Sequence, residues 1–276
     1  MKYKLCVFDV DGTLIGPDEV VPTETINAIS HLQAQGSRIC LATGRSLVET
    51  MPIWRQLKLA APHEPMILVG GSLVSEPDTG RTLCQRTISH DDACEYADAL
   101  CQAGYSALAI VDVWRHGVDY YICESADAAW VEQMWFSKMK VTVQRLAKFD
   151  GQLPSPLRIN CVAPPEAAAR LAQELSQRFA GRLNIHSIYA PNYDVTVVEA
   201  FAKDCTKWAG VMYVAQAYRI KPREIACFGD DVNDLPMISS AGLGVAMPWA
   251  VPGVKQAAKA IAQPNLATFL RNLPAS

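Results

Sequence analysis

The sequence places two aspartates one residue apart at the end of its first apolar run. Residues 4–8 read KLCVF, and Asp9, Val10, Asp11 and Gly12 follow. Burying one unpaired carboxylate costs several kcal/mol, and two carboxylates that lie close together also repel each other. The spacing therefore predicts a positively charged partner, such as a metal ion, beside the two side chains.

Three later segments place groups that can bind an anion or a cation next to predicted strands or at the start of predicted helices. CLATGR offers the Thr43 hydroxyl and the backbone N–H of Gly44 at a helix start, where anions bind readily. Lys207 begins another predicted helix, and a second acidic loop, GDDVND, spans residues 229–234. Because ligands of open parallel sheets bind at the carboxyl ends of the strands, we expect these segments to meet beside Asp9.

The segments that position these residues alternate between strands and helices. The N-terminal part predicts strands at 4–8, 38–42 and 66–70, with helices at 23–35 and 46–59 between them. The C-terminal part predicts helices at 204–219, 234–241, 250–259 and 265–272, and strands at 224–228, 242–247 and 259–262. Continuous apolar strands that alternate with helices indicate an α/β fold with a doubly wound, Rossmann-like parallel sheet.

The middle of the chain has a different pattern. It predicts a helix at 89–103, a hairpin of two strands at 106–114 and 117–124 with a polar turn between them, a Trp-rich helix at 125–138, a strand at 156–162, a helix at 165–180, and strands near 183–189 and 194–200. We expect an inserted α+β cap domain over residues 84–189, between core segments 1–83 and 190–276.

The bulk composition narrows the possible partners. The 276 residues carry a formal net charge of -3 and half of them are apolar, so a dedicated nucleic-acid binder, which needs a basic face, is disfavoured. The sequence contains no signal peptide pattern and no apolar run long enough to span a membrane, so we expect a cytoplasmic monomer or homodimer without membrane partners. The nine cysteines lack metal-site spacing and are expected to be reduced.

Together, DVDGT at 9–13, TGR at 43–45, Lys207 and GDDVND in this order resemble the haloacid-dehalogenase-like (HAD) superfamily of phosphatases. The size and place of the insert resemble the Cof-type subgroup with a C2 cap. The resemblance implies hydrolysis of a small phosphorylated metabolite, such as a sugar phosphate or a similar organic phosphate monoester. It implies that Asp9 is the nucleophile that forms an aspartyl-phosphate and that Asp11 is the general acid and base.

The resemblance also implies a set of binding residues. Mg²⁺ would be held by the Asp9 side chain, the Asp11 backbone carbonyl and the Asp230 side chain, which are hard oxygen ligands of the kind this ion prefers. Asp234 is expected to support the site from behind, and Asp231 is the acidic residue with the least defined role. The phosphate group would be bound by the backbone at Val10 and by Thr43, Gly44, Lys207 and Asn233.

Two positions depart from the subgroup pattern. Gly70 stands where an Asn is usual, and Trp208 follows Lys207 where a Gly is usual, so Lys203 remains a rival for the lysine's role. The alternatives are a phosphometabolite-binding or regulatory module with weak catalysis, and a phosphotransferase or phosphomutase of the same superfamily. A hydrolytic dehalogenase needs no metal and lacks the second Asp, so Asp11 and Asp230 count against it.

Overall fold

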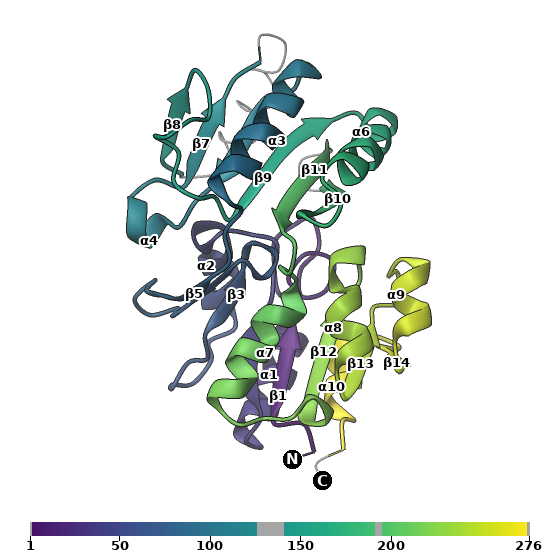
Figure 1. Ribbon diagram of the computed structural model, residues 1–276. Helices are drawn as coiled ribbons and strands as arrows, with labels where there is room; N and C mark the ends of the chain where they lie inside the picture. Colours follow the sequence, from purple (N-terminus) through teal and green to yellow (C-terminus); the bar gives the residue numbers. More distant parts are fainter. Residues whose placement is uncertain (1, 126–140, 191–194, 275–276) are drawn as a thin grey trace. The chain divides into compact units, whose positions relative to one another are not determined.

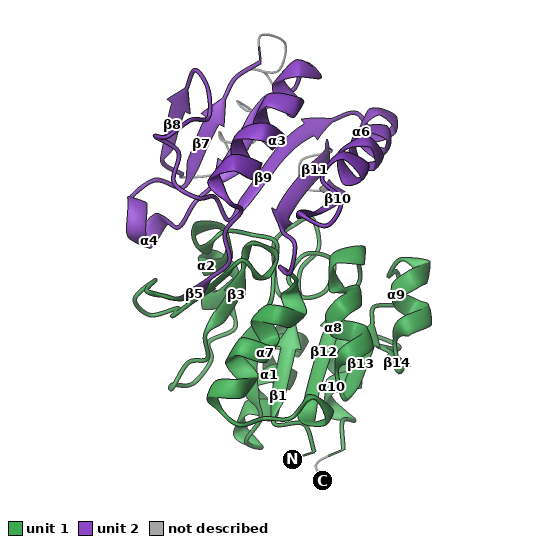
Figure 2. Ribbon diagram, in the orientation of Figure 1, with its two compact units in different colours: residues 1–83, 206–276 green, residues 84–205 purple. Residues whose placement is uncertain are grey.

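The computed structural model describes residues 2–125, 141–190 and 195–274 (Figure 1). The chain divides into two compact units, unit 1 with residues 1–83 and 206–276, and unit 2 with residues 84–205 (Figure 2). This division differs from the expected one at residues 190–205, which lie in unit 2. The reason is that strand β11 (Val195–Ala202) is paired on both sides with strands of unit 2.

Unit 1 is built on a five-stranded parallel sheet in the order β14-β13-β12-β1-β2. Its strands are β1 (Leu5–Phe8), β2 (Arg38–Leu41), β12 (Ile225–Gly229), β13 (Leu243–Ala246) and β14 (Ala260–Ile261). The central strands β1 and β12 are buried along their whole length, which explains their continuous apolar sequence. In their core the Phe8 and Phe228 rings stack with centroids 4.6 Å apart.

Helices cover both faces of this sheet. They are α1 (Thr23–Ala34), α2 (Leu47–Gln56), α7 (Lys207–Ala217), α8 (Leu235–Ser240), α9 (Pro252–Ala257) and α10 (Leu266–Arg271), with 3₁₀ turns η1 (Val69–Gly71), η2 (Pro222–Glu224) and η3 (Val232–Asp234). Helix α1 packs beside α10, and α7 packs beside α8 on the other face (Figure 1). The doubly wound α/β core predicted from the sequence is therefore confirmed.

The third predicted strand departs from the expected parallel arrangement. Strand β3 (Met66–Leu68) makes only an isolated parallel bridge to the β2 side, between Ala42 and Ile67. Its regular ladder is antiparallel to β4 (Leu73–Ser75), and β5 (Thr82–Gln85) completes a three-stranded sheet. The chain turns back immediately after β3 because the η1 turn reverses its direction, and the sequence reasoning did not include β4 and β5.

Unit 2 is an α+β unit with a six-stranded sheet in the order β10-β11-β9-β6-β7-β8. The strands are β6 (Ala107–Ile110), β7 (Tyr120–Cys123), β8 (Val143–Leu146), β9 (Arg158–Ala163), β10 (Leu183–Ala190) and β11, and the helices are α3 (His90–Gln102), α4 (Val113–His116) and α6 (Pro165–Arg178). One apolar core unites α3 and α6 with side chains of the sheet, among them Ile159 and Val198.

Unit 2 differs from the sequence prediction at the hairpin turn and at strand β8. Strands β6 and β7 pair antiparallel as expected, but the short helix α4, capped by Asp112, joins them in place of a simple polar turn. Strand β8 was not predicted, because its side chains are only partly buried or exposed and its apolar pattern is weak. The Trp-rich helix expected over residues 125–138 lies outside the described residues apart from residue 125.

Two expectations about the whole chain can be compared with the described residues. Within those residues, no helix is both long enough and apolar enough to cross a membrane. All nine cysteines are free, and Cys6, Cys40 and Cys227 are buried in strands of the unit 1 sheet.

Candidate active site

The carboxyl ends of β1, β2 and β12 bring the predicted residues of unit 1 together. Because β1 lies between β12 and β2 in parallel register, Asp9 follows Phe8 at the centre of this edge, where its N–H donates to the Phe228 carbonyl at 3.0 Å. Thr43 lies just beyond β2, and Asp230 lies just beyond β12. This is the edge at which open α/β sheets bind their ligands.

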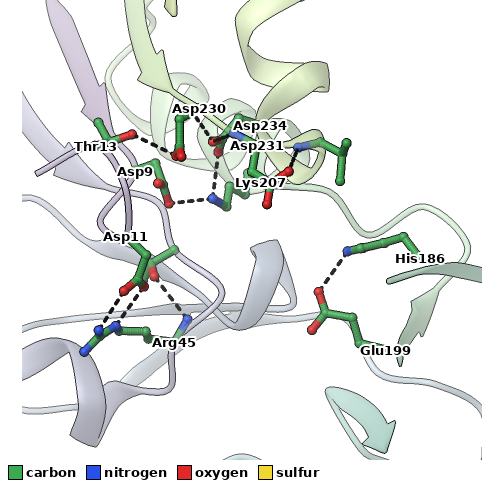
Figure 3. A network of polar contacts seen from close by, with 12 residues as sticks. Asp9, Asp11, Thr13, Arg45, His186, Glu199, Lys207, Asp230, Asp231 and Asp234 are labelled. Carbon is green, nitrogen blue, oxygen red and sulfur yellow. Dashed lines mark hydrogen bonds and ion pairs between the residues drawn. The ribbon is translucent and has the colours of Figure 1, made fainter. Parts of the chain in front are cut away.

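Lys207 connects two of the carboxylates at this edge. It is the first residue of α7, and the side chain of Thr206 caps that helix by accepting a hydrogen bond from the Ala209 N–H. The Lys207 Nζ lies 2.6 Å from Asp9 Oδ1 and 2.6 Å from Asp234 Oδ1, and all three side chains are buried (Figure 3). The rival Lys203 is exposed and precedes the helix, so Lys207 is the lysine at the site.

Asp234 supports the acidic loop from behind. Its Oδ2 accepts hydrogen bonds from the backbone N–H groups of Asp230 at 2.9 Å and Asp231 at 3.2 Å. Gly229 makes this possible, since a Cβ there would lie 2.5 Å from the Asp234 carboxylate. The Asp231 side chain accepts from the Val232 N–H and closes the η3 turn, which gives this residue a structural part in the loop.

The charges at this site do not balance. Carboxylate oxygens of Asp9, Asp230 and Asp234 all lie within 4.8 Å of one another, and Lys207 supplies the buried ammonium beside them. Burial, together with the negative charge of Asp234, raises the pKa of Asp230 to about 7 and raises the pKa of Asp9 well above its usual value. Although burial opposes it, the neighbouring carboxylates raise the pKa of Lys207, which therefore stays charged.

This excess of negative charge fits a divalent cation. Both oxygens of Asp234 are engaged by Lys207 and by backbone N–H groups, so Asp9 and Asp230 are the carboxylates best placed to be ligands. Lys207 contacts Asp9 through one carboxylate oxygen, Oδ1. A cation at this point would also relieve the repulsion that raises the pKa values of the two carboxyl groups.

Asp11 is held apart from this group by a different cation. Arg45 donates to both oxygens of the Asp11 carboxylate, from Nε at 2.8 Å and from NH2 at 2.7 Å, and the same NH2 lies 2.7 Å from Glu19 (Figure 3). The two aspartates of the opening motif thus have separate cationic partners. The sequence contained this Arg as the last residue of TGR, but nothing in the spacing indicated its partner.

The other predicted phosphate-binding residues lie around the same edge. Thr43 is fully buried, and its Oγ1 accepts a hydrogen bond from the Arg45 N–H. Val10 is buried, and its carbonyl accepts from the turn that follows. Asn233 lies in η3 with its Oδ1 buried and without a hydrogen-bond partner, so this amide is available to a ligand. Gly44 directly precedes Arg45 in the loop between β2 and α2.

The two departures from the expected motif have local explanations. Gly70 has φ 65° and ψ 12°, a left-handed conformation that Gly adopts freely and Asn tolerates, so the backbone suits either residue and only the side chain is missing. The η1 turn approaches the start of α7 closely at Gly71, where a Cβ would lie 2.1 Å from the Thr206 carbonyl oxygen. The small residue at this contact is thus Gly71, and the residue after Lys207 can be large. Trp208 therefore does not displace Lys207 from the site.

Comparison with known proteins identifies the family. Residues 6–267 match the model of the haloacid dehalogenase-like hydrolases, so the chain belongs to this family, as the four motifs predicted. It is 27% identical to a putative phosphatase of Haemophilus influenzae, over 96% of this chain and 94% of that protein. It is also 27% identical to an HMP-PP phosphatase of Serratia proteamaculans, over 92% of this chain and 86% of that protein.

A solved structure agrees with the fold. The HAD subclass IIB sugar phosphatase BT4131 superposes with a TM-score of 0.77 at 20% identity, with 99% of this chain and 100% of that chain covered. The family and the phosphatases among the chain's relatives together identify it as a phosphatase.

Proposed function

We propose that this phosphatase is Mg²⁺-dependent and hydrolyses a small phosphorylated metabolite through an aspartyl-phosphate on Asp9. The observation that carries the proposal is the buried group of three carboxylates and one ammonium at the carboxyl end of the sheet. Burying a group with excess negative charge costs folding free energy, and such groups are typical of catalytic and ligand-binding sites.

Asp9 is the nucleophile in this proposal. A carboxylate oxygen of Asp9 attacks phosphorus, and the bond between phosphorus and the ester oxygen breaks as the new Asp9–phosphorus bond forms. Lys207 restrains the carboxylate through Oδ1 and places a positive charge where the phosphoryl oxygens gather. The Thr43 hydroxyl and the Nδ2–H groups of the Asn233 amide would donate further hydrogen bonds to those oxygens.

Asp11 carries the protons. In the first half-reaction its carboxyl gives a proton to the leaving alcohol oxygen. In the second half it takes a proton from the water that attacks phosphorus, and the bond between phosphorus and Asp9 breaks to release inorganic phosphate and the free carboxylate. The bidentate pair with Arg45 orients the ionised Asp11 carboxylate, which is the form that takes the proton from water in the second half-reaction.

Mg²⁺ would be held by the side chains of Asp9 and Asp230 and by the Asp11 backbone carbonyl, and when bound it supplies positive charge that offsets the charge of the transferring phosphoryl group. Thr13 donates to Asp230 Oδ1 at 3.3 Å and so helps to orient that carboxylate. Asp234 and Lys207 hold the loop that carries it.

For the substrate, we propose a sugar phosphate or a similar organic phosphate monoester. One relative is named as an HMP-PP phosphatase and one solved structure of the same fold as a sugar phosphatase, which supports small phosphorylated metabolites as the class. Unit 2 corresponds to the inserted cap of the sequence analysis, and we propose that it selects among such substrates.

The test is release of inorganic phosphate from a panel of sugar phosphates, nucleotides and 4-nitrophenyl phosphate, with Mg²⁺ or with EDTA, beside the Asp9→Asn variant. We expect release that requires both the metal and Asp9. Release that continues unchanged in EDTA would overturn the metal assignment. No release from any compound by folded protein would favour the alternative of a phosphometabolite-binding module.

A further inference from the structure

Trp249 lies in the turn after β13 and is 63% exposed, which is unusual for the largest apolar side chain. Burial therefore does not explain its position. Its indole Nε1–H donates to the backbone carbonyl of Gly12 at 2.6 Å, although the two residues are 237 positions apart in the chain. The bond connects this turn to the loop that carries Asp9 and Asp11.

The backbone at Gly12 also packs closely against the Asp230 side chain. Gly12 has φ +74°, and a Cβ at this position would lie 2.2 Å from Asp230 Oδ2, so the backbone here approaches the Asp230 carboxylate as closely as only Gly allows. Its N–H also donates to the Ile15 carbonyl at 3.0 Å. Gly12, the residue that directly follows Asp11, is thus held between the Asp230 carboxylate and the indole of Trp249.

The turn that carries Trp249 is itself attached to the acidic loop. The Met247 N–H donates to the Gly229 carbonyl at 3.1 Å, and the Val251 N–H donates to the Asp230 carbonyl at 2.9 Å. These bonds place the indole at a fixed point relative to Asp230. The bond from Trp249 to Gly12 then ties the Asp11 loop to the same frame.

We infer that Trp249 is a positioning residue for the general acid. Its N–H fixes the turn at Gly12, and this turn sets where the Asp11 carboxyl meets the oxygen of the leaving alcohol. Arg45 orients the carboxylate itself, whereas Trp249 fixes the backbone from which that side chain extends. The inference rests on the proposed function, which assigns proton transfer to Asp11.

The dependence of the rate on the leaving group tests this inference. An alkyl phosphate needs a proton on its leaving oxygen, whereas 4-nitrophenolate is a stable anion that needs little protonation. Trp249→Phe keeps an aromatic ring but removes the N–H. The quantity to compare is kcat/KM, which reports only the steps up to formation of the aspartyl-phosphate and so excludes the hydrolysis that both substrates share. We expect kcat/KM to fall by about 10-fold or more for an alkyl phosphate (glycerol 2-phosphate or the best alkyl substrate of the panel) and by less than about 3-fold for 4-nitrophenyl phosphate.

Two further variants complete the experiment. Trp249→His restores a ring N–H and should return part of the lost preference for the alkyl phosphate. Trp54→Phe removes the N–H of another Trp, in helix α2 of unit 1, and should change kcat/KM for neither substrate. Equal losses on both substrates, or no loss on either, in folded Trp249→Phe would overturn the inference. A wild-type protein that hydrolyses neither compound would instead contradict the proposed function.

Discussion

Each unit buries a group of charged side chains, but the charges balance in only one of them. In unit 2, Arg158 and Glu199 form a one-to-one ion pair at 3.0 Å, and the His186 ring lies 2.8 Å from the same carboxylate on a neighbouring strand. In unit 1, Lys207 faces the carboxylates of Asp9 and Asp234, with Asp230 close by. The balanced group can be explained by folding alone, whereas the unbalanced group needs a further cation.

The two groups differ in whether their buried charges are neutralised by the protein itself or need a bound ligand. A buried pair roughly offsets its own desolvation when its geometry is good, as in the group around Glu199. Excess negative charge lowers the stability of the folded state until a ligand neutralises it, and this is the behaviour expected of a site for a metal and a phosphoryl group.

Asp9→Asn should give the largest change in rate. The amide is almost the same size and can still lie beside Lys207, but it is not a nucleophile, so turnover should fall by about 10⁴-fold or more. The measurement is steady-state phosphate release, with circular dichroism to show that the variant is folded. Turnover within about 10-fold of wild type would contradict the role of Asp9.

Lys207→Met should lower the stability of the folded protein. Removal of the buried ammonium leaves Asp9 and Asp234 without their cation, and breaking such a pair costs about 3–5 kcal/mol in free energy of unfolding. Urea denaturation measures this loss. Lys203→Met makes the same chemical change at an exposed position and should shift the free energy of unfolding by no more than about 0.5 kcal/mol. Equal effects of the two substitutions would contradict the site.

Arg45→Lys should have an intermediate effect on rate. Lysine keeps the charge but cannot donate to both oxygens of Asp11 in the planar arrangement of arginine, so kcat should fall by about 10-fold. Glu19→Gln is the matched control, because it weakens the outer contact of Arg45 and keeps the pair with Asp11. A larger loss in Glu19→Gln than in Arg45→Lys would show that the outer contact matters more.

Asp230→Asn and Glu199→Gln should change stability with opposite signs in EDTA at pH 8. The folded-state pKa of Asp230 is raised to about 7, so ionisation opposes folding increasingly as the pH rises from the ordinary carboxyl pKa to about 7. Asn removes this cost and should raise the free energy of unfolding by about 1 kcal/mol. Gln at position 199 removes the partner of Arg158 and should lower it by about 1–3 kcal/mol. Two shifts of the same sign would remove the distinction between the groups.

Added Mg²⁺ provides the complementary measurement on the same variants. Wild-type protein and Glu199→Gln should both gain thermal stability from the ion, because their unit 1 carboxylates are intact. Asp230→Asn should gain much less. An equal gain in all three proteins would show that the ion binds elsewhere.

The sequence predicted most of the unit 1 core because its signals are local. Continuous apolar runs gave β1, β2 and β12, and the motifs that follow them located Asp9, Thr43 and Asp230 at one edge. The antiparallel turn back after β3 could not be predicted in the same way, because β4 is only three residues long and its pairing is set by the η1 turn.

The contacts between distant loops were the part that the sequence could not supply. Arg45 and Asp11 are 34 residues apart, and Trp249 and Gly12 are 237 apart, so no periodicity relates either pair. These contacts depend on the crossing connections of the doubly wound sheet, which bring loops together only after the strands have paired. The residue types at the site were thus predictable, whereas most of the contacts that hold them were not.

Mass spectrometry of protein quenched in acid during turnover of 4-nitrophenyl phosphate with Mg²⁺ would detect the aspartyl-phosphate itself. We expect a phosphoryl group on the peptide that contains Asp9, removed by hydroxylamine and missing in Asp9→Asn. Turnover of the wild-type protein with the phosphoryl group on another residue, or phosphate release by Asp9→Asn at the wild-type rate, would contradict the assignment of Asp9 as the nucleophile.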